Sequence, residues 1–240
     1  RLVGQDVCLI DSGNDKDAGR KVRQLLDANG WHLTAIYNTH SNADHIGGNR
    51  YLQGQTGCRI YAPGIDCAFT RHPVLEPSFL YGGYPCRELR HKFLMAQESD
   101  ARELTEECLP EGFEIIPLPG HFFDMVGFRT SDDVAYLADC LSSRETLDKY
   151  QIGFIYDVAA YLNTLEMVKS MQAKVFVPAH AAAAEEVGDE HSRIRGGFYN
   201  AFQKGSRFLS CIFNTFNGLR INWMCNSFTD TRIQTDNPRL

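Results

Sequence analysis

The stretch Thr39-His40-Ser41-Asn42-Ala43-Asp44-His45-Ile46-Gly47-Gly48 decides which fold this sequence predicts. It closely follows the apolar run Leu33–Tyr37, which is typical of a buried strand. Its polar residues have the spacing His-x-Asn-x-Asp-His, and no turn requires them there. Neutral imidazole and carboxylate groups are common ligands of zinc, iron and manganese. We therefore expect a metal site just beyond the end of a strand.

Strands and helices alternate on both sides of this stretch. The apolar runs predict strands at Asp6–Asp11, Leu33–Tyr37, Arg59–Ala62, Phe113–Leu118, Gly127–Thr130, Val134–Ala138 and Lys174–Pro178. Apolar residues at helical spacing predict helices from Ala18 to the cap at Asn29-Gly30, at Ile46–Gln55, near Leu89–Met95, at Asp157–Met171, from just after His180, and at Phe198–Phe213. This alternation is typical of an α/β fold.

The segment from Asp66 to Pro110 interrupts the alternation and predicts an irregular insertion, such as a lid or binding loop. Two interpretations of its aromatic and basic residues stay open: contact with an anionic or aromatic substrate, or packing within the insertion or a homodimer interface. These residues are Phe79, Tyr81, Tyr84, Arg87, Arg90, His91 and Lys92. We predict one domain over residues 1–240 and assign no structure to the tail at 214–240.

Three more candidate ligands come at or just beyond predicted strand ends. His121 follows one strand through Pro119-Gly120, Asp139 ends the next, and His180 follows the last through Pro178-Ala179. Loops at strand ends in α/β sheets bring together residues from distant parts of the chain. Any one of these residues alone is as well explained by an ordinary turn or a surface position. Together with the first stretch they exceed the needs of one tetrahedral ion, so we expect two metals that share a carboxylate.

Five ordered motifs resemble those of the metallo-β-lactamase-fold hydrolase superfamily between Asp6 and His180. The motifs are Ile10-Asp11-Ser12-Gly13, the stretch Thr39–Gly48, Pro119-Gly120-His121, Leu137-Ala138-Asp139 and Pro178-Ala179-His180. The resemblance implies a four-layer αβ/βα sandwich with a dinuclear site at one edge, between two sheets. Family members usually have one or two strands ahead of the Asp-Ser-Gly strand, so we expect either a trimmed N-terminus or another element at that edge.

The resemblance also implies a role for each candidate residue. It places His40 and His121 at the first metal, Asp44, His45 and His180 at the second, and Asp139 between the two. Asp44 would in addition orient or deprotonate the water that attacks the substrate, which makes it the expected catalytic residue. Asp11 is usually structural in this family, so we expect it to lie outside the ligand set.

Asn42 departs from the family pattern, which has a second histidine at this position. An amide offers one neutral oxygen, a weaker and harder donor than imidazole. Three outcomes are open: Asn42 is a weak ligand in a full dinuclear site, the second position holds most of the metal, or the site prefers manganese or iron. We expect two divalent ions, zinc first, with a first site that Asn42 weakens.

Composition limits the partners and the compartment. The 240 residues carry a net charge of −6, which disfavours binding to a phosphate backbone. No run of about 18 apolar residues predicts a membrane span. The eight cysteines are scattered without a CxxC pair, and Arg1-Leu2-Val3-Gly4 lacks the form of a signal peptide, so we expect reduced thiols and a cytoplasmic protein. We expect Cys140 to point into the sheet, away from the metals.

The metal site alone does not define the substrate, because specificity in this family depends on inserted loops. We predict a hydrolase that uses a metal-activated water on a small ester, thioester or related molecule. The alternative is a non-hydrolytic metal- or ligand-binding protein, or an iron-dependent redox enzyme, on the same scaffold.

Overall fold

The computed structural model describes residues 4–150 and 153–187 and contains two four-stranded sheets. The first sheet has the order β1 (Asp6–Ile10), β2 (His32–Tyr37), β3 (Arg59–Ala62) and β4 (Ala101–Glu103). All of its neighbouring strands are parallel. Both faces of such a sheet must be covered, since parallel strands of this kind are apolar on both sides.

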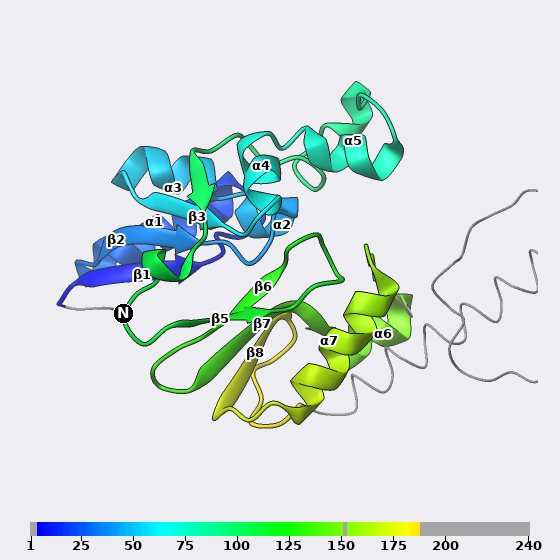
Figure 1. Cartoon of the computed structure of the whole chain (residues 1–240). Coiled ribbons are helices and arrows are strands. Elements are labelled where there is room, and N and C mark those ends of the chain that lie inside the picture. The colour runs from blue at the N-terminus through cyan, green and yellow to red at the C-terminus, as the bar shows by residue number, and fades with distance from the viewer. Residues whose placement is uncertain (1–3, 151–152, 188–240) are drawn as a thin grey trace, which may run out of the picture. The chain divides into compact units, whose positions relative to one another are not determined.

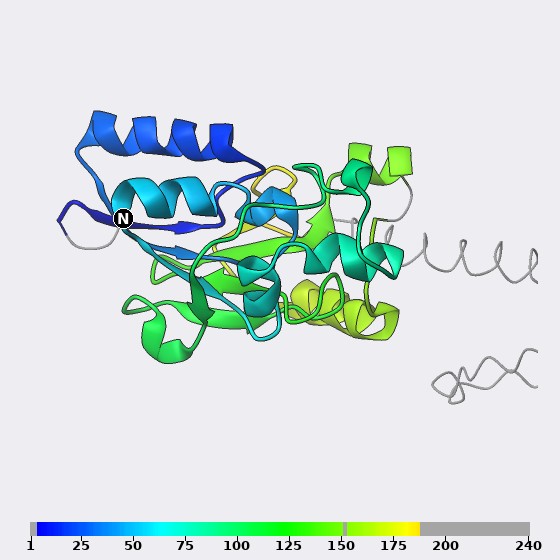
Figure 2. The same cartoon turned by 90° about the horizontal axis from the view of Figure 1, so that it is seen from above.

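Helices cover one face of the first sheet (Figure 1). α1 (Lys16–Asn29) and α3 (Asn49–Thr56) run side by side there (Figure 2). The Asp15 side chain accepts hydrogen bonds from the first turn of α1, and Gly30 ends that helix in the left-handed conformation. Leu26 and Leu52 from the two helices are buried in one apolar cluster with strand residues such as Ile60.

The second sheet has the order β5 (Glu114–Pro117), β6 (Val126–Arg129), β7 (Val134–Ser142) and β8 (Val175–His180). β5, β6 and β7 are antiparallel, and β8 is parallel to β7. α7 (Val158–Ser170) covers the outer face, where Leu165 and Val168 are buried in one cluster with Leu137. The short helix α6 (Arg144–Tyr150) follows β7.

Aromatic side chains fill the space between the two sheets. Tyr37 and Tyr61 of the first sheet stack with ring centroids 5.4 Å apart, and Phe128 of the second sheet meets Tyr37 edge-on at 6.1 Å. The order of layers is therefore helices, sheet, sheet, helix, which confirms the predicted four-layer αβ/βα sandwich (Figure 1).

The predicted helix at residues 46–55 is divided into two. α2 (Ala43–Ile46) is a single turn, and α3 begins only at Asn49. Gly47 and Gly48 separate them because a Cβ at either position would lie within 2.4 Å of the backbone of Asn14 or Ser12. The Asp-Ser-Gly turn after β1 thus lies directly against the end of α2.

Residues 66–110 contain more regular structure than the sequence indicated. They include α4 (Asp66–Arg71), α5 (Leu75–Tyr81) and strand β4, with irregular chain between them. The helix predicted near Leu89–Met95 is wrong, because that stretch is a short 3-10 helix at Arg87–Leu89 followed by turns. No helix begins in residues 181–187, where Ala184 pairs with Phe176 of β8 instead. The predicted helix at Phe198–Phe213 and the tail at 214–240 lie outside the described residues.

Six of the eight cysteines lie among the described residues. Cys8, Cys58, Cys67, Cys86, Cys108 and Cys140 are all free, while Cys211 and Cys225 lie outside the described residues. Cys140 is fully buried, as predicted, and burial raises the pKa of its thiol to about 12. Across the part of the chain that the structure describes, no helix is both long and apolar enough to cross a membrane.

Candidate metal centre

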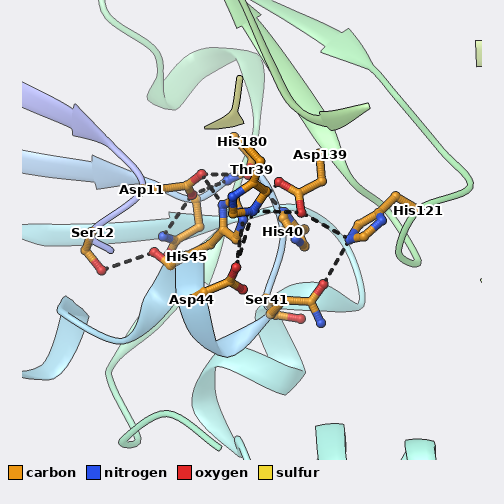
Figure 3. A network of polar contacts seen from close by, with 12 residues as sticks. Asp11, Ser12, Thr39, His40, Ser41, Asp44, His45, His121, Asp139 and His180 are labelled. Atoms are coloured by element: carbon orange, nitrogen blue, oxygen red, sulfur yellow. Dashed lines mark hydrogen bonds and ion pairs between the residues drawn. The ribbon is translucent and has the colours of Figure 1, made fainter. Parts of the chain in front are cut away.

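The predicted ligands converge at the edge of the molecule where β2, β7 and β8 approach one another (Figure 3). His40 and Asn42 lie in the loop after β2, Asp44 and His45 in α2, His121 in the loop between β5 and β6, Asp139 in β7, and His180 at the end of β8. β7 continues through Ser142, so Asp139 does not end a strand as predicted. It lies at an irregularity of the β7–β8 ladder, directly after Ala138, whose φ is +47°.

The first set, which we call the buried group, consists of His40, His45 and Asp139. Their ligand atoms lie within 4.8 Å of one another. Nε2 of both histidines and Oδ1 of Asp139 are buried without any hydrogen-bond partner. Nε2 of His45 is 3.0 Å from Oδ1 of Asp139, but the contact does not have hydrogen-bond geometry. Unpaired buried polar atoms are costly, and divalent cations bound here would satisfy all three. The donor set therefore fits a metal ion.

A second set, the open group, consists of Asp44, His45 and His180. Oδ2 of Asp44 lies 3.3 Å from Nε2 of His180, and the two side chains are 44% and 46% exposed. His180 also lies 3.2 Å from Oδ2 of Asp139. The open group matches the set that the family resemblance assigned to the second metal, and His45 belongs to both groups.

His121 and Asn42 border the buried group. Nε2 of His121 lies 3.2 Å from Oδ1 of Asn42 and 3.5 Å from Oδ2 of Asp139. The His121 ring meets the His40 ring edge-on, with centroids 5.2 Å apart. The resemblance placed His121 with His40 at the first metal, whereas the tightest set around His40 includes His45. Both arrangements share Asp139.

Hydrogen bonds leave the Nε2 atoms of His40 and His45 free for a ligand role. The Thr39 hydroxyl donates its only proton to Asp11 at 2.8 Å, so it must accept from Nδ1 of His40, 3.0 Å away. Nδ1 of His45 lies 2.8 Å from Oδ2 of Asp11, the same oxygen that accepts from Thr39, and donates to it. Fixing the proton on Nδ1 points the Nε2 lone pair at the metal position. Asp11 belongs to neither group of candidate ligands, yet it contacts the candidate ligand His45 directly.

The family model of the metallo-beta-lactamase superfamily matches residues 2–180. The chain belongs to this superfamily. Among solved structures, a metallo-beta-lactamase from Pontibacter korlensis is 16% identical with a TM-score of 0.60 and covers 82% of this chain and 83% of that one. TTHA1623 in a di-iron-bound form is 22% identical with a TM-score of 0.53, over 73% and 82% of the two chains. These likenesses show the shared metallo-beta-lactamase fold.

A curated relative in the superfamily is named hydroxyacylglutathione hydrolase. The protein of that name from Nitrobacter winogradskyi is 43% identical over 138 residues, which cover 54% of this chain and 42% of the relative. One from Maricaulis maris is 48% identical over 79 residues, 27% of this chain and 31% of the relative. The chain spans less than half the length of the curated relatives that it matches.

Two buried carboxylates that the sequence did not indicate support residues 39–45, which we call the ligand loop. Asp66 accepts hydrogen bonds from the Ser41 backbone and hydroxyl, each at 2.8 Å, and from the Asp124 backbone at 2.9 Å. Glu76 accepts one from the Asn42 amide at 2.8 Å. Asp66 follows the end of β3, so the strand-end rule could have found it. No sequence signal marks Glu76.

Burial raises the pKa of both supporting carboxyls. The pKa of Asp66 rises to about 6, although hydrogen bonds from the Asp124 and Ser41 backbones oppose the change. The pKa of Glu76 rises to about 8, and the hydrogen bond from Asn42 opposes it.

The histidines divide by the charge around them. Burial, and then the neighbouring His45, lower the pKa of His40 well below its ordinary value, so its imidazole is neutral. Burial also opposes a charge on His45, but the nearby Asp11 and Asp139 carboxylates raise its pKa well above the ordinary value. Hydrogen bonds with Asp139 and Asp44 raise the pKa of His180 to about 10. A negative field that holds protons on two histidines also favours a divalent cation in their place.

α7 supports two of the ligands from behind. The Tyr161 hydroxyl donates to the Cys140 carbonyl at 2.7 Å, and the Thr164 hydroxyl donates to the Pro119 carbonyl at 2.8 Å. Gly120 has a φ of +120°, and a Cβ there would lie 2.3 Å from the Tyr161 backbone nitrogen. The glycine next to His121 is therefore required by the close approach of α7.

A cavity of about 260 Å³ opens beside the candidate centre. One end is formed by the metal-site residues His121, Asp139 and His180; the other walls are formed by Ser142, Thr146, Leu147, Gly153, Phe154, Ile155 and Tyr161. Phe154 meets the His121 ring edge-on at 6.1 Å. Of the aromatic residues singled out in the insertion, Phe79 packs on Phe122 and Phe123, whereas Tyr81 and Tyr84 are exposed.

Proposed function

We propose that the chain is a metal-dependent hydrolase of a small acyl thioester or ester. The observation that carries the proposal is the buried group, in which three unpartnered ligand atoms meet beside the cavity. A buried set of two imidazoles and a carboxylate has no structural use for its unpaired atoms, whereas a hydrolytic metal centre uses all of them.

Two observations favour a thioester as the first substrate class to test. The curated relatives are named hydroxyacylglutathione hydrolase, and a hydroxyacylglutathione is a thioester. The cavity is lined by the apolar side chains Leu147, Phe154 and Ile155 together with the hydroxyls of Ser142 and Thr146. Such a lining fits a short acyl group that carries a hydroxyl, because a few polar groups in an apolar pocket fix orientation.

The residues present would hold two divalent ions, zinc first, with manganese or iron as alternatives. The proposed ligands are His40, Asn42, His121 and Asp139 for the first ion and Asp44, His45, His180 and Asp139 for the second. The chemistry that such ions supply is a lowered pKa of water and polarisation of a carbonyl oxygen.

Asp44 is the residue that we propose to handle the proton of the attacking water. It lies at the rim of the open group, and its carboxylate is 44% exposed. Burial acts to raise its pKa, but the hydrogen bond with His180 and the charge of His45 lower it below the ordinary value. Asp44 therefore stays ionised at neutral pH, so it can orient a water molecule and accept its proton.

Hydrolysis assays with metal-loaded protein test the proposal. The substrates are a hydroxyacylglutathione, a short acyl thioester of another thiol, and a p-nitrophenyl ester. The blank is Asp44→Ala, and the matched control is Asp100→Ala, which removes an exposed carboxylate far along the sequence. We expect turnover in the wild type and the control only. Metal-loaded wild type with no turnover above the blank would contradict the proposal and favour a non-hydrolytic role.

Elemental analysis of protein purified without added metal tests the ions separately. Zinc or manganese near two per chain supports the hydrolase. A single iron would favour redox chemistry on the same scaffold.

A further inference from the structure

The Asn42 side chain has different partners at its two ends. Its Nδ2 donates to Oε1 of Glu76 at 2.8 Å, and its Oδ1 lies 3.2 Å from Nε2 of His121. Glu76 lies in α5 and is only 5% exposed, so water does not compete for this contact. The amide therefore connects a buried carboxyl on one side with a predicted metal ligand on the other.

The chemistry of the two groups favours one orientation of the amide. Oε1 of Glu76 accepts a hydrogen bond whether or not the other carboxyl oxygen carries a proton. If the amide were turned over, its oxygen would face Glu76, where only a protonated carboxyl could donate to it, and the amide N–H groups would face His121 and repel a cation. Glu76 thus selects the orientation in which the Asn42 oxygen faces the centre.

Both partners of Glu76 belong to the ligand loop. Besides the Asn42 amide, the backbone N–H of Ala43 forms a hydrogen bond with this carboxyl. Burying a carboxyl is costly unless it is hydrogen-bonded, so a glutamate at this position needs a compensating role. Leu75 and Pro77 on either side give no reason for a charged residue in α5.

We propose that Glu76 is a positioning residue of the metal centre: by accepting from Nδ2 of Asn42, it turns the amide oxygen toward His121 and makes Asn42 an oxygen ligand of the first ion. The proposal rests on the proposed function for the presence of a metal centre, but it does not depend on the substrate. The loop thereby offers a fixed oxygen at the position where the family has a histidine nitrogen.

A swap of the hydrogen-bonding groups tests this role. Glu76→Gln presents an amide N–H to Asn42 and favours the reversed orientation, so we expect the weaker metal ion to bind about 10- to 100-fold less tightly. Adding Asn42→Asp to this variant gives the new amide N–H at position 76 a carboxylate oxygen to donate to. The other carboxylate oxygen then faces the centre. We expect Asn42→Asp to improve binding in the Glu76→Gln background by a larger factor than in the wild type, where it places two carboxylates together.

The readout is metal binding itself. Zinc affinity comes from competition with a chromogenic chelator, stoichiometry from elemental analysis, and ligand geometry from the absorption of bound cobalt(II). Glu88→Gln, an exposed change nearby in the same segment, is the matched control and should bind both ions as the wild type does. Asn42→Ala provides a second double-mutant comparison. Adding Glu76→Gln to it should cause no further loss, because a glutamine can still accept from the Ala43 N–H and Glu76 otherwise acts on the centre through Asn42.

Each outcome separates this proposal from the proposed function. A wild type that binds no divalent ion overturns both. A wild type that binds two ions while Glu76→Gln binds them equally well overturns the role of Glu76 alone. A further loss when Glu76→Gln is added to Asn42→Ala also overturns it, because Glu76 would then act independently of Asn42. A protein that hydrolyses no thioester or ester, but whose metal binding changes as expected in both sets of double variants, overturns the proposed function and leaves the role of Glu76 intact.

Discussion

The buried group and the open group share His45 but are built in different ways. In the buried group, His40 and His45 are 0% and 4% exposed, and Thr39 and Asp11 fix both rings. In the open group, Asp44 and His180 are nearly half exposed and contact each other, and His180 also contacts Asp139. The two histidines of the buried group are thus held by residues of the first sheet and its loops and Asp139 comes from β7, whereas the open group is completed only by the end of β8.

This difference suggests a division of work between the groups. A rigid, dehydrated set of ligands favours tight retention of an ion, because little ordering is needed when it binds. An exposed set leaves coordination positions that water and substrate can reach. The four predictions below test that division, from the largest expected effect to the smallest.

Asp139→Ala should disrupt both groups, because Oδ1 of Asp139 contacts His45 and its Oδ2 contacts His121 and His180. We expect the loss of both ions. The rate of hydrolysis should fall by well over the roughly 100-fold that is typical when a residue that only hydrogen-bonds to a ligand is changed. Elemental analysis and thioester hydrolysis measure the two effects. Asp132→Ala, an exposed carboxylate, is the control. Two ions retained in Asp139→Ala would refute the shared-ligand arrangement.

Asp66 gives the loop under the buried group a pH-dependent contribution to folding. Its pKa rises from 3.8 to about 6 on folding, so its stabilising contribution is complete below pH 3.8 and is lost as the pH rises through about 6. We expect this group to lower the free energy of unfolding by up to about 3 kcal/mol between pH 4 and 7. Urea unfolding across that pH range measures this free energy. The Asp66→Asn variant should lack this part of its pH dependence.

The control for this slope is Asp100→Asn, which changes an exposed aspartate and should keep the wild-type pH dependence. An Asp66→Asn variant with the same pH dependence as the wild type would show that folding does not change the pKa of Asp66.

Asp11→Ala should lower the metal affinity of the buried group more than that of the open group. It removes the acceptor that holds Nδ1 of His45 and the partner of the Thr39 hydroxyl, so both rings lose their fixed orientation. Loss of such an outer partner costs about 10- to 100-fold in metal affinity. Chelator competition measures it, and Asp11→Asn, which keeps one acceptor oxygen, should lose less. Equal affinities in all three proteins would mean that the rings are held by packing alone.

Asn42→His should strengthen the first metal position, because imidazole binds zinc better than an amide oxygen does. We expect metal content after purification to rise from about one toward about two ions per chain, with an affinity gain of about tenfold. Elemental analysis decides the matter. A wild type that already retains two ions would contradict the expectation of a weakened first site.

The convergence of the seven ligand candidates could be predicted because the ends of neighbouring strands meet at one edge of a sheet. His40 and His121 each follow a strand, and His180 ends one, and all three strands were recognisable from their apolar residues alone. The four-layer fold followed from the same strands, together with motifs whose order matches the superfamily.

The supporting parts of the site could not be predicted, because they depend on contacts between distant segments. Glu76 lies in a helix with no apolar periodicity of its own, and its role depends on a partner 34 residues earlier in the chain. The position of Asp139 inside β7 depends on a left-handed alanine, which the local sequence does not indicate. β4 is only three residues long and is defined by pairing with β3.

Gly120 has a consequence for how mutations in this chain should be interpreted. Its neighbour His121 is the residue that a screen for inactive alleles would be expected to return. Any side chain at Gly120 collides with the backbone of α7 and pushes the loop away, so Gly120→Ala should score as a null allele although every ligand is intact. A compensating mutation for such an allele is then to be sought in α7, far from the chemistry.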